Sequence, residues 1–148
     1  MKLSTKGRYG VKAMVHLAIN YGGEPVSIKA IAQENNISEY YLEQLFSSLR
    51  KGGLIKSIRG AQGGYVLSRE PKYITVKDIM LLLEGPVEIS DCLSEDCCDN
   101  VDKCPTRLLW VRLQDSIENV IQSTNLQDMV DDYNSMRTID MTFISKEI

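Results

Sequence analysis

Apolar side chains recur three to four residues apart through the first 51 residues, a spacing that predicts helices. Three helices are expected, over residues 3–22, 27–36 and 38–51, with Ser27 and Ser38 as the N-caps of the second and third. The break "GGEP", the tight connection "NNIS" and the terminal "KGG" separate and end them. The three apolar stripes consist of Val11, Met14, Val15, Ala18 and Ile19, then Ile28, Ile31 and Ala32, then Leu42, Leu45, Phe46 and Leu49.

The period of the pattern changes after this helical third. The runs "LIKSIRG" and "YVLS" predict two short strands, and "GAQGG" between them predicts a hairpin whose glycines permit positive φ and close approach to another surface. A further helix is expected from Thr75, which forms a capping-box pattern with Asp78, to Gly85. Pro105 opens a long helix, "TNLQDMVDDY" predicts a last short one, and the tail from Asn134 is left unassigned.

Two short helices, a tight turn between them and a glycine-rich hairpin follow the order of a winged helix-turn-helix. The predicted fold is mainly α: a winged helix-turn-helix with a small β-hairpin wing and a long C-terminal dimerisation helix. The expected divisions are a DNA-binding domain over residues 1–84, a cysteine-rich loop over 85–104, and the dimerisation helix with its tail over 105–148.

The long helix carries apolar residues four positions apart, which are Leu109, Leu113, Ile117 and Ile121. This stripe is too apolar for a helix that projects from a small domain. It predicts burial against a second copy of the chain in a two-fold homodimer.

The net charge of −3 conceals an asymmetry. Residues 1–70 carry ten Lys and Arg against five Asp and Glu, a net of +5, whereas residues 71–148 carry seven against fifteen, a net of −8. A basic first half suits a polyanionic partner such as DNA. The polar, basic start and the lack of a long apolar run argue against a signal peptide and a membrane span, which predicts a cytoplasmic location. With one histidine and no phosphate loop or nucleophile–base pair, no enzyme is expected.

The second helix of a helix-turn-helix enters the major groove with its N-terminal residues at the base edges. Gln44 suits a bidentate contact to adenine, whereas the Glu43 carboxylate accepts only from a donor such as cytosine N4 and would discriminate between bases. Arg59 on the glycine-rich wing suits the narrow minor groove. The predicted DNA-contacting residues are Ser38, Tyr40, Tyr41, Glu43, Gln44, Arg59 and Gly60. A winged helix that binds only protein is the alternative.

All four cysteines lie in the acidic stretch "DCLSEDCCDNVDKCP". Thiols gathered in a cytoplasmic chain indicate metal or redox chemistry. Cys92, Cys98 and Cys104 are separated by five residues each, which favours an iron–sulfur cluster over zinc, whose sites usually contain short Cys-x₂₋₄-Cys pairs. A two-iron, two-sulfur cluster is preferred, with a four-iron, four-sulfur cluster or a structural zinc as alternatives. The start of the long helix favours a thiolate at Cys104.

The stretches "LSTKGRYG", "YLEQLFSSLRKGGL" and "SIRGAQGGY", and the three cysteines followed by "LLW", resemble the IscR-like family of winged-helix transcription regulators over residues 1 to about 130. The resemblance implies a homodimer formed through the long helix, operator DNA as partner, and an iron–sulfur cluster in members that keep the three cysteines. It also places Ser38, Glu43, Gln44 and Arg59 at base-contacting positions. A nearby branch lacks the cysteines and regulates cysteine metabolism through a partner enzyme.

Two positions depart from the pattern of the resembled family. Where well-known members have a histidine as fourth ligand this chain has Arg107, and where a nitric-oxide-sensing branch has a carboxylate it has Arg8. Arginine does not coordinate iron, so the fourth ligand is open. The only histidine, His16, is expected to pack on the apolar side of the first helix. The remaining candidates are Cys97, which is not expected to be required, and, through oxygen, Glu95, Asp96 and Asp99.

The sequence therefore predicts a dimeric, DNA-binding transcription regulator, acting as a repressor, which senses iron–sulfur status, oxygen or nitric oxide through a cluster held by three cysteines. Two reader helices on a two-fold axis require a near-palindromic operator with half-sites about one helical turn, roughly 34 Å, apart. The alternatives are a regulator of cysteine or sulfur metabolism that acts with a partner enzyme, and a small electron-transfer iron–sulfur protein.

Overall fold

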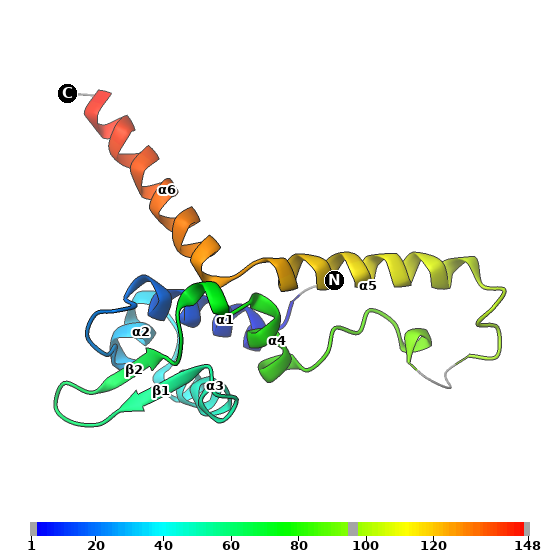
Figure 1. Cartoon of the computed structure of the whole chain (residues 1–148), viewed down its shortest axis with the longest axis horizontal. Helices are drawn as coiled ribbons and strands as arrows, with labels where there is room; N and C mark the ends of the chain where they lie inside the picture. The colour runs from blue at the N-terminus through cyan, green and yellow to red at the C-terminus, as the bar shows by residue number, and fades with distance from the viewer. Residues whose placement is uncertain (1–2, 95–97, 147–148) are drawn as a thin grey trace.

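Three helices and a hairpin make up the first half of the chain in this computed structural model, which describes residues 3–94 and 98–146, with side chains as far as residue 139. The elements in chain order are α1 (Thr5–Ile19), α2 (Ile28–Asn35), α3 (Glu39–Lys51), β1 (Ile55–Ile58), β2 (Gly64–Leu67), the 3-10 turn η1 (Pro71–Tyr73), α4 (Val76–Glu84), the 3-10 turn η2 (Asp91–Leu93), α5 (Pro105–Ser123) and α6 (Leu126–Lys146) (Figure 1). The predicted mainly helical fold with a two-stranded wing is confirmed.

Capping residues start the helices where the sequence predicts. The Ser27 and Ser38 hydroxyls each accept a hydrogen bond from the backbone N–H three residues later, at 3.1 and 3.2 Å. Thr75 and Asp78 form the predicted capping box at the start of α4, with bonds of 3.1 and 2.9 Å. Between α2 and α3, Asn36 has a left-handed backbone conformation with φ 53°, which makes the tight turn of the helix-turn-helix.

The hairpin of the wing is joined to the helix-turn-helix through its backbone. β1 and β2 are antiparallel, and Val26, just before α2, exchanges two hydrogen bonds with Tyr65 on β2 at 3.0 and 2.8 Å. A Cβ on Gly64 would lie 2.4 Å from the Val26 carbonyl oxygen, so only glycine permits this approach. Gly60 at the wing tip has φ +117°. The wing is therefore fixed relative to α2 and α3.

The hydrophobic core lies between α1, α2, α3, α4 and the base of the wing. α4 lies close against α1, because Gly10 leaves room for the Leu83 side chain and the Gly7 N–H donates to the Glu84 carboxylate at 2.8 Å. The α3 stripe is buried as predicted, whereas Ile19 at the end of α1 is exposed. The largest fully enclosed side chains are Phe46, Met14, Ile31, Leu42, Leu49, Ile55, Ile74, Ile79 and Leu126.

The segment after α4 leaves the domain and returns to it. In Figure 1 the cysteine-containing loop runs out to the far end of α5, and α5 leads back to the start of α4. Two backbone hydrogen bonds of 2.9 Å close this excursion, from the Val76 N–H to Thr124 O and from the Leu126 N–H to Ile74 O. α6 then packs its first turns on α1 and η1 and projects away from the wing (Figure 1). It continues to Lys146, through the tail that the sequence left unassigned.

Within residues 3–94 and 98–146, the search for a helix both long and apolar enough to span a bilayer finds none.

Candidate functional site

The outer face of α3 carries the predicted base-reading residues. Glu43 and Gln44 are exposed, and Tyr40 is 72% exposed. The opposite face holds the buried stripe of Leu42, Leu45, Phe46 and Leu49. α3 thus presents a polar face to solvent. Its outer side chains, Tyr40, Glu43 and Gln44, are not part of the core. This arrangement is open to a partner, and it matches the placement of a recognition helix.

Two of the predicted DNA-contacting residues also have structural contacts. The Tyr41 hydroxyl lies 3.2 Å from the Thr5 hydroxyl oxygen, and its ring meets the Tyr9 ring edge-on with centroids 6.1 Å apart. Tyr41 is therefore half-buried and joins α3 to α1, a contact that the sequence did not predict. The Ser38 oxygen already accepts the capping hydrogen bond of α3, so towards a partner this hydroxyl would act chiefly as a donor.

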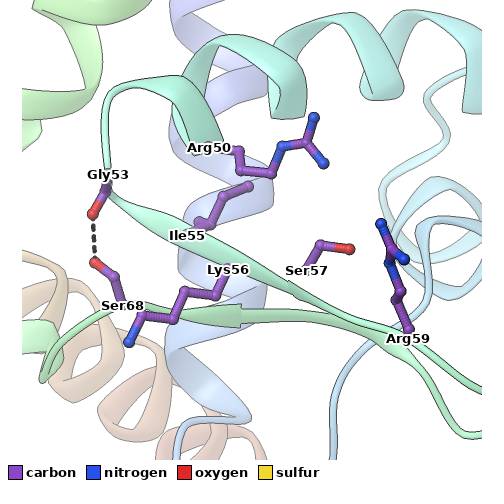
Figure 2. A pocket seen from close by; sticks show the side chains of 7 residues that line it. All are labelled: Arg50, Gly53, Ile55, Lys56, Ser57, Arg59 and Ser68. Atoms are coloured by element: carbon purple, nitrogen blue, oxygen red, sulfur yellow. Dashed lines mark hydrogen bonds between the residues drawn. The ribbon is translucent and has the colours of Figure 1, made fainter.

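A groove of about 450 Å³ separates the C-terminal half of α3 from β1. Figure 2 shows Ser57 on β1 and Arg59 just after it on the side that faces Arg50, while Lys56 extends the other way, towards Ser68. The Ser68 hydroxyl donates to the Gly53 carbonyl oxygen at 2.6 Å. The residues that line the groove are Arg50, Gly53, Ile55, Lys56, Ser57, Arg59 and Ser68.

The groove is positively charged. Three of its lining residues are cationic, Arg50, Lys56 and Arg59, and all three are exposed. No acidic side chain lines it, and over the described part of the chain no salt bridge involves any of the three. The sequence prediction named only Arg59. The position of Arg50, seven residues after Glu43 and so on nearly the same helix face, was the available signal.

At the other end of the molecule, Cys104 lies at the N-cap position of α5. Its Sγ is 3.1 Å from the Thr106 hydroxyl, and this hydrogen bond, followed by the backbone N–H of Arg107, lowers the pKa of the Cys104 thiol. The predicted thiolate-favouring environment at the helix start is therefore present. Thr106 was not among the predicted site residues, although a hydroxyl in the first turn of a helix is a natural partner for the capping position.

Arg107 connects the two ends of the cysteine loop. Its half-buried guanidinium donates to the backbone carbonyl of Cys92 at 2.9 Å, while its own N–H stabilises the Cys104 thiolate. The Cys92 thiol is 3.0 Å from the Ser90 hydroxyl. The residue that stands where well-known IscR-like members have a histidine thus contacts the backbone of one predicted ligand and the thiol of another.

The donor chemistry of these two cysteines fits a metal or iron–sulfur centre, but the ligand set is not assembled. Cys98 is exposed, and among the described side chains no three from His, Cys, Asp and Glu lie close enough to hold a metal ion. Of the fourth-ligand candidates, Asp99 is exposed and His16 is half-buried in α1. The others, Cys97, Glu95 and Asp96, lie outside the described residues.

The apolar stripe of α5 is uncovered in the single chain. No residue of this helix is buried, and Leu109 and Leu113 are 48% and 39% exposed. Ile117 and Ile121, nearer the domain, are half-buried. The stripe therefore offers apolar surface to a partner along the outer half of the helix.

The comparisons with known proteins agree with the fold. The "HTH-type transcriptional regulator CymR" of Bacillus subtilis is 50% identical over 129 residues, 87% of this chain and 89% of that protein. The "HTH-type transcriptional regulator IscR" of Escherichia coli is 37% identical over 142 residues, 96% of this chain and 86% of that protein.

Solved structures give the same result. "The Structure of CymR (YrzC) the Global Cysteine Regulator of B. subtilis" has a TM-score of 0.76 at 50% identity, covering 88% of this chain and 97% of that one. "T. potens IscR" also has a TM-score of 0.76, at 47% identity, covering 90% and 88%. The model of the Rrf2 family, described as "Iron-dependent Transcriptional regulator", matches residues 3–132. The predicted resemblance is confirmed: the chain belongs to the Rrf2 family of transcriptional regulators.

Proposed function

We propose that this DNA-binding regulator is a homodimeric repressor whose operator affinity follows the state of an iron–sulfur cluster held by Cys92, Cys98 and Cys104. The observation that carries the proposal is the environment of Cys104, a capping residue whose thiol has a lowered pKa at the start of α5. Thiolates are the ligands that iron–sulfur clusters require. An iron–sulfur cluster, when bound, supplies a centre that reacts with oxygen or nitric oxide.

The Arg107–Cys92 hydrogen bond supports the same proposal. It holds the first cysteine of the loop near the helix that begins at the third, across a sequence separation of 15 residues. Cys98 is exposed, and the proposal requires its thiol to join those of Cys92 and Cys104 around the cluster. The positive charge of Arg107 also contributes to lowering the pKa of the Cys104 thiol.

On the DNA side, the proposal assigns base contacts to the outer face of α3 and to the wing. Glu43 and Gln44 read bases in the major groove, Arg59 with Gly60 enters the minor groove, and Tyr40 contacts phosphate. The exposed stripe of α5 pairs with its copy, so that two α3 helices meet a near-palindromic operator. The divisions at residues 84 and 104 separate the DNA-binding part, the sensing loop and the dimerisation part.

A second candidate is supported by the relatives. CymR of Bacillus subtilis is called the global cysteine regulator, and it is 50% identical to this chain. In this alternative the chain would regulate cysteine metabolism with a partner enzyme, and its cysteines would hold no cluster. The two candidates differ in whether protein purified without oxygen contains iron and sulfide.

The test uses the full-length chain and four single Cys→Ala variants purified without oxygen, compared by iron and sulfide content and by visible absorption. We expect the wild type to be coloured, and the variants of Cys92, Cys98 and Cys104 to lose the colour. Cys97→Ala should keep it. Colour lost equally in Cys97→Ala would make that residue the fourth ligand. Wild-type protein without iron or sulfide favours the cysteine-metabolism candidate, and zinc in its place makes the loop a structural staple.

A further inference from the structure

We propose that the groove lined by the end of α3, by β1 and by Ser68 binds phosphates of the DNA backbone. Arg50 on its α3 side and Lys56 on its Ser68 side would be contacts that are independent of base sequence. The proposal rests on the proposed reading role of α3 and is independent of the cluster. It adds Arg50, Lys56 and Ser57 to the interface. These three residues set affinity and position, whereas Glu43 and Gln44 select the sequence.

The charge of the groove supports a polyanionic occupant. Its three cations line an open space of about 450 Å³ that no carboxylate enters, and none of them forms an ion pair with a described residue. Elsewhere on the described surface three lysines and arginines, Arg69, Lys72 and Lys77, each have a carboxylate within 3.7 Å. The cations of the groove are therefore available to neutralise an external charge.

The position of Arg50 on α3 indicates that the polyanion is DNA. Arg50 lies seven residues beyond Glu43, which is about 10.5 Å along a helix axis and nearly the same face. When the N-terminal residues of a recognition helix reach the base edges, its C-terminal end lies nearer the rim of the major groove, where the phosphates are. Arg50 is thus placed at the rim.

The wing gives the second boundary. Arg59, directly after β1, extends on the same side as Ser57 and faces the side of α3 that carries Arg50 (Figure 2). With Arg59 in a minor groove and α3 in the adjacent major groove, the sugar–phosphate strand that separates these two grooves must cross the space between them. The part of the groove lined by Arg50, Ser57 and Arg59 lies in that space, and Lys56 continues the positive charge on the Ser68 side of β1.

The donors in the groove suit phosphate oxygens. The Arg50 guanidinium can donate two parallel hydrogen bonds to one phosphate, and the Lys56 ammonium acts as a compact point charge. The exposed Ser57 hydroxyl adds a neutral donor, whereas the Ser68 hydroxyl is already used by the Gly53 carbonyl. The buried Ile55 forms the apolar floor. In this proposal these groups contact phosphates and not base edges, so their contribution to affinity does not depend on sequence.

The experiment measures binding to a short duplex of mixed sequence by fluorescence anisotropy over a series of sodium chloride concentrations. Each neutralised phosphate contributes about 0.9 to the slope of log affinity against log salt. We expect Arg50→Gln and Lys56→Gln each to reduce the slope by about that amount and to weaken every duplex equally. Arg50→Lys should keep the slope, because it keeps the charge. The matched control is Lys72→Gln, which makes the same change of charge on η1, where Lys72 is paired with Glu70.

Three outcomes would overturn the proposal. If Arg50→Gln and Lys56→Gln keep the wild-type slope while the wild type binds duplexes, the groove is not a phosphate seat, although α3 still reads DNA. If Lys72→Gln lowers the slope equally, net charge alone is responsible. If sodium phosphate inhibits the wild type more than sodium chloride at equal ionic strength, and Arg50→Gln removes the difference, the groove binds free anions. A wild type that binds no duplex contradicts the DNA-reading role itself.

Discussion

Cys104 and Thr106 show how much one side chain can change the chemistry of its neighbour. The thiol belongs to the N-cap residue of α5, and the hydroxyl two residues later supplies the largest contribution that lowers its pKa. Because the thiolate is the reactive form, Cys104 should be nucleophilic at a lower pH than an ordinary cysteine. Removing the hydroxyl without changing the shape of the side chain tests that statement directly.

For Thr106→Val we expect the pKa of Cys104 to rise, because the hydrogen bond to the thiolate is lost. The alkylation rate of Cys104 should then fall at neutral pH and recover only at higher pH. The measurement is the rate of iodoacetamide labelling against pH in iron-free protein, followed by peptide mass spectrometry. Labelling of Cys98 in the same sample is the internal control, and equal slowing at both residues would contradict the prediction.

Glu43 raises a different question at the same scale, since a carboxylate on the proposed DNA-reading helix would repel phosphates. In the proposed role its value lies in selection, because it would accept from cytosine N4 and disfavour bases that offer no donor. We expect Glu43→Ala to bind non-cognate duplexes more tightly and to lose discrimination by roughly 1–3 kcal/mol at one base pair. Selection of operators from a random pool would show this, and uniform weakening on all sequences would refute it. Tyr40→Phe is the matched control, because it changes a phosphate contact alone.

Among the elements, α1 to α4 and the wing were predictable because their signals are local. Their signals lie within a few residues of one another: the N-caps are Ser27, Ser38 and Thr75, and each apolar stripe repeats within one helix. Such signals can be read without knowledge of any tertiary contact. The groove was not predictable in this way. It depends on the side of β1 that faces α3, which the pairing of the wing with Val26 determines. The Arg107–Cys92 bond likewise joins residues that no periodic pattern connects.

The length of α6 was underestimated for a related reason. Asn125 and Asp128 form reciprocal bonds of 2.9 and 3.0 Å at its start, a local signal that was available. Its continuation lacks a strong apolar stripe, and Met136 and Ile139 are 65% and 57% exposed. Its first turns anchor the helix to the domain: Leu126 is completely buried, and the half-buried Val130 packs against the core.

We therefore expect Leu126→Ala to destabilise the fold by about 2–5 kcal/mol, the range for removing a buried leucine side chain. The matched control is Val120→Ala, since Val120 is 63% exposed and its truncation should change stability little. Urea denaturation followed by circular dichroism gives both values. A small effect at Leu126 would mean that α6 detaches without cost and that the α1–α6 contact is unimportant.

For the whole molecule, the exposed stripe of α5 sets the expected assembly. Replacing Leu113 and Ile117 with Asp places two carboxylates where the copies should meet, and we expect monomers with weakened operator binding. Analytical ultracentrifugation measures the state, and circular dichroism checks that the variant is folded. Arg112→Asp and Ser116→Asp, exposed residues of the same helix, form the matched control. A double variant of Leu113 and Ile117 that stays dimeric would remove α5 from the interface.

The hydrogen bonds between Val76 and Thr124 and between Leu126 and Ile74 also bear on what a cut in the chain would do. They join the start of α4 to the point at which the polypeptide re-enters the domain after α5. A peptide bond broken between residues 86 and 94 would divide the chain into two fragments, yet the second would remain attached through Leu126 and these backbone bonds. The nicked protein would migrate as one species on a native gel and as two on a denaturing gel, with its DNA-binding half still folded.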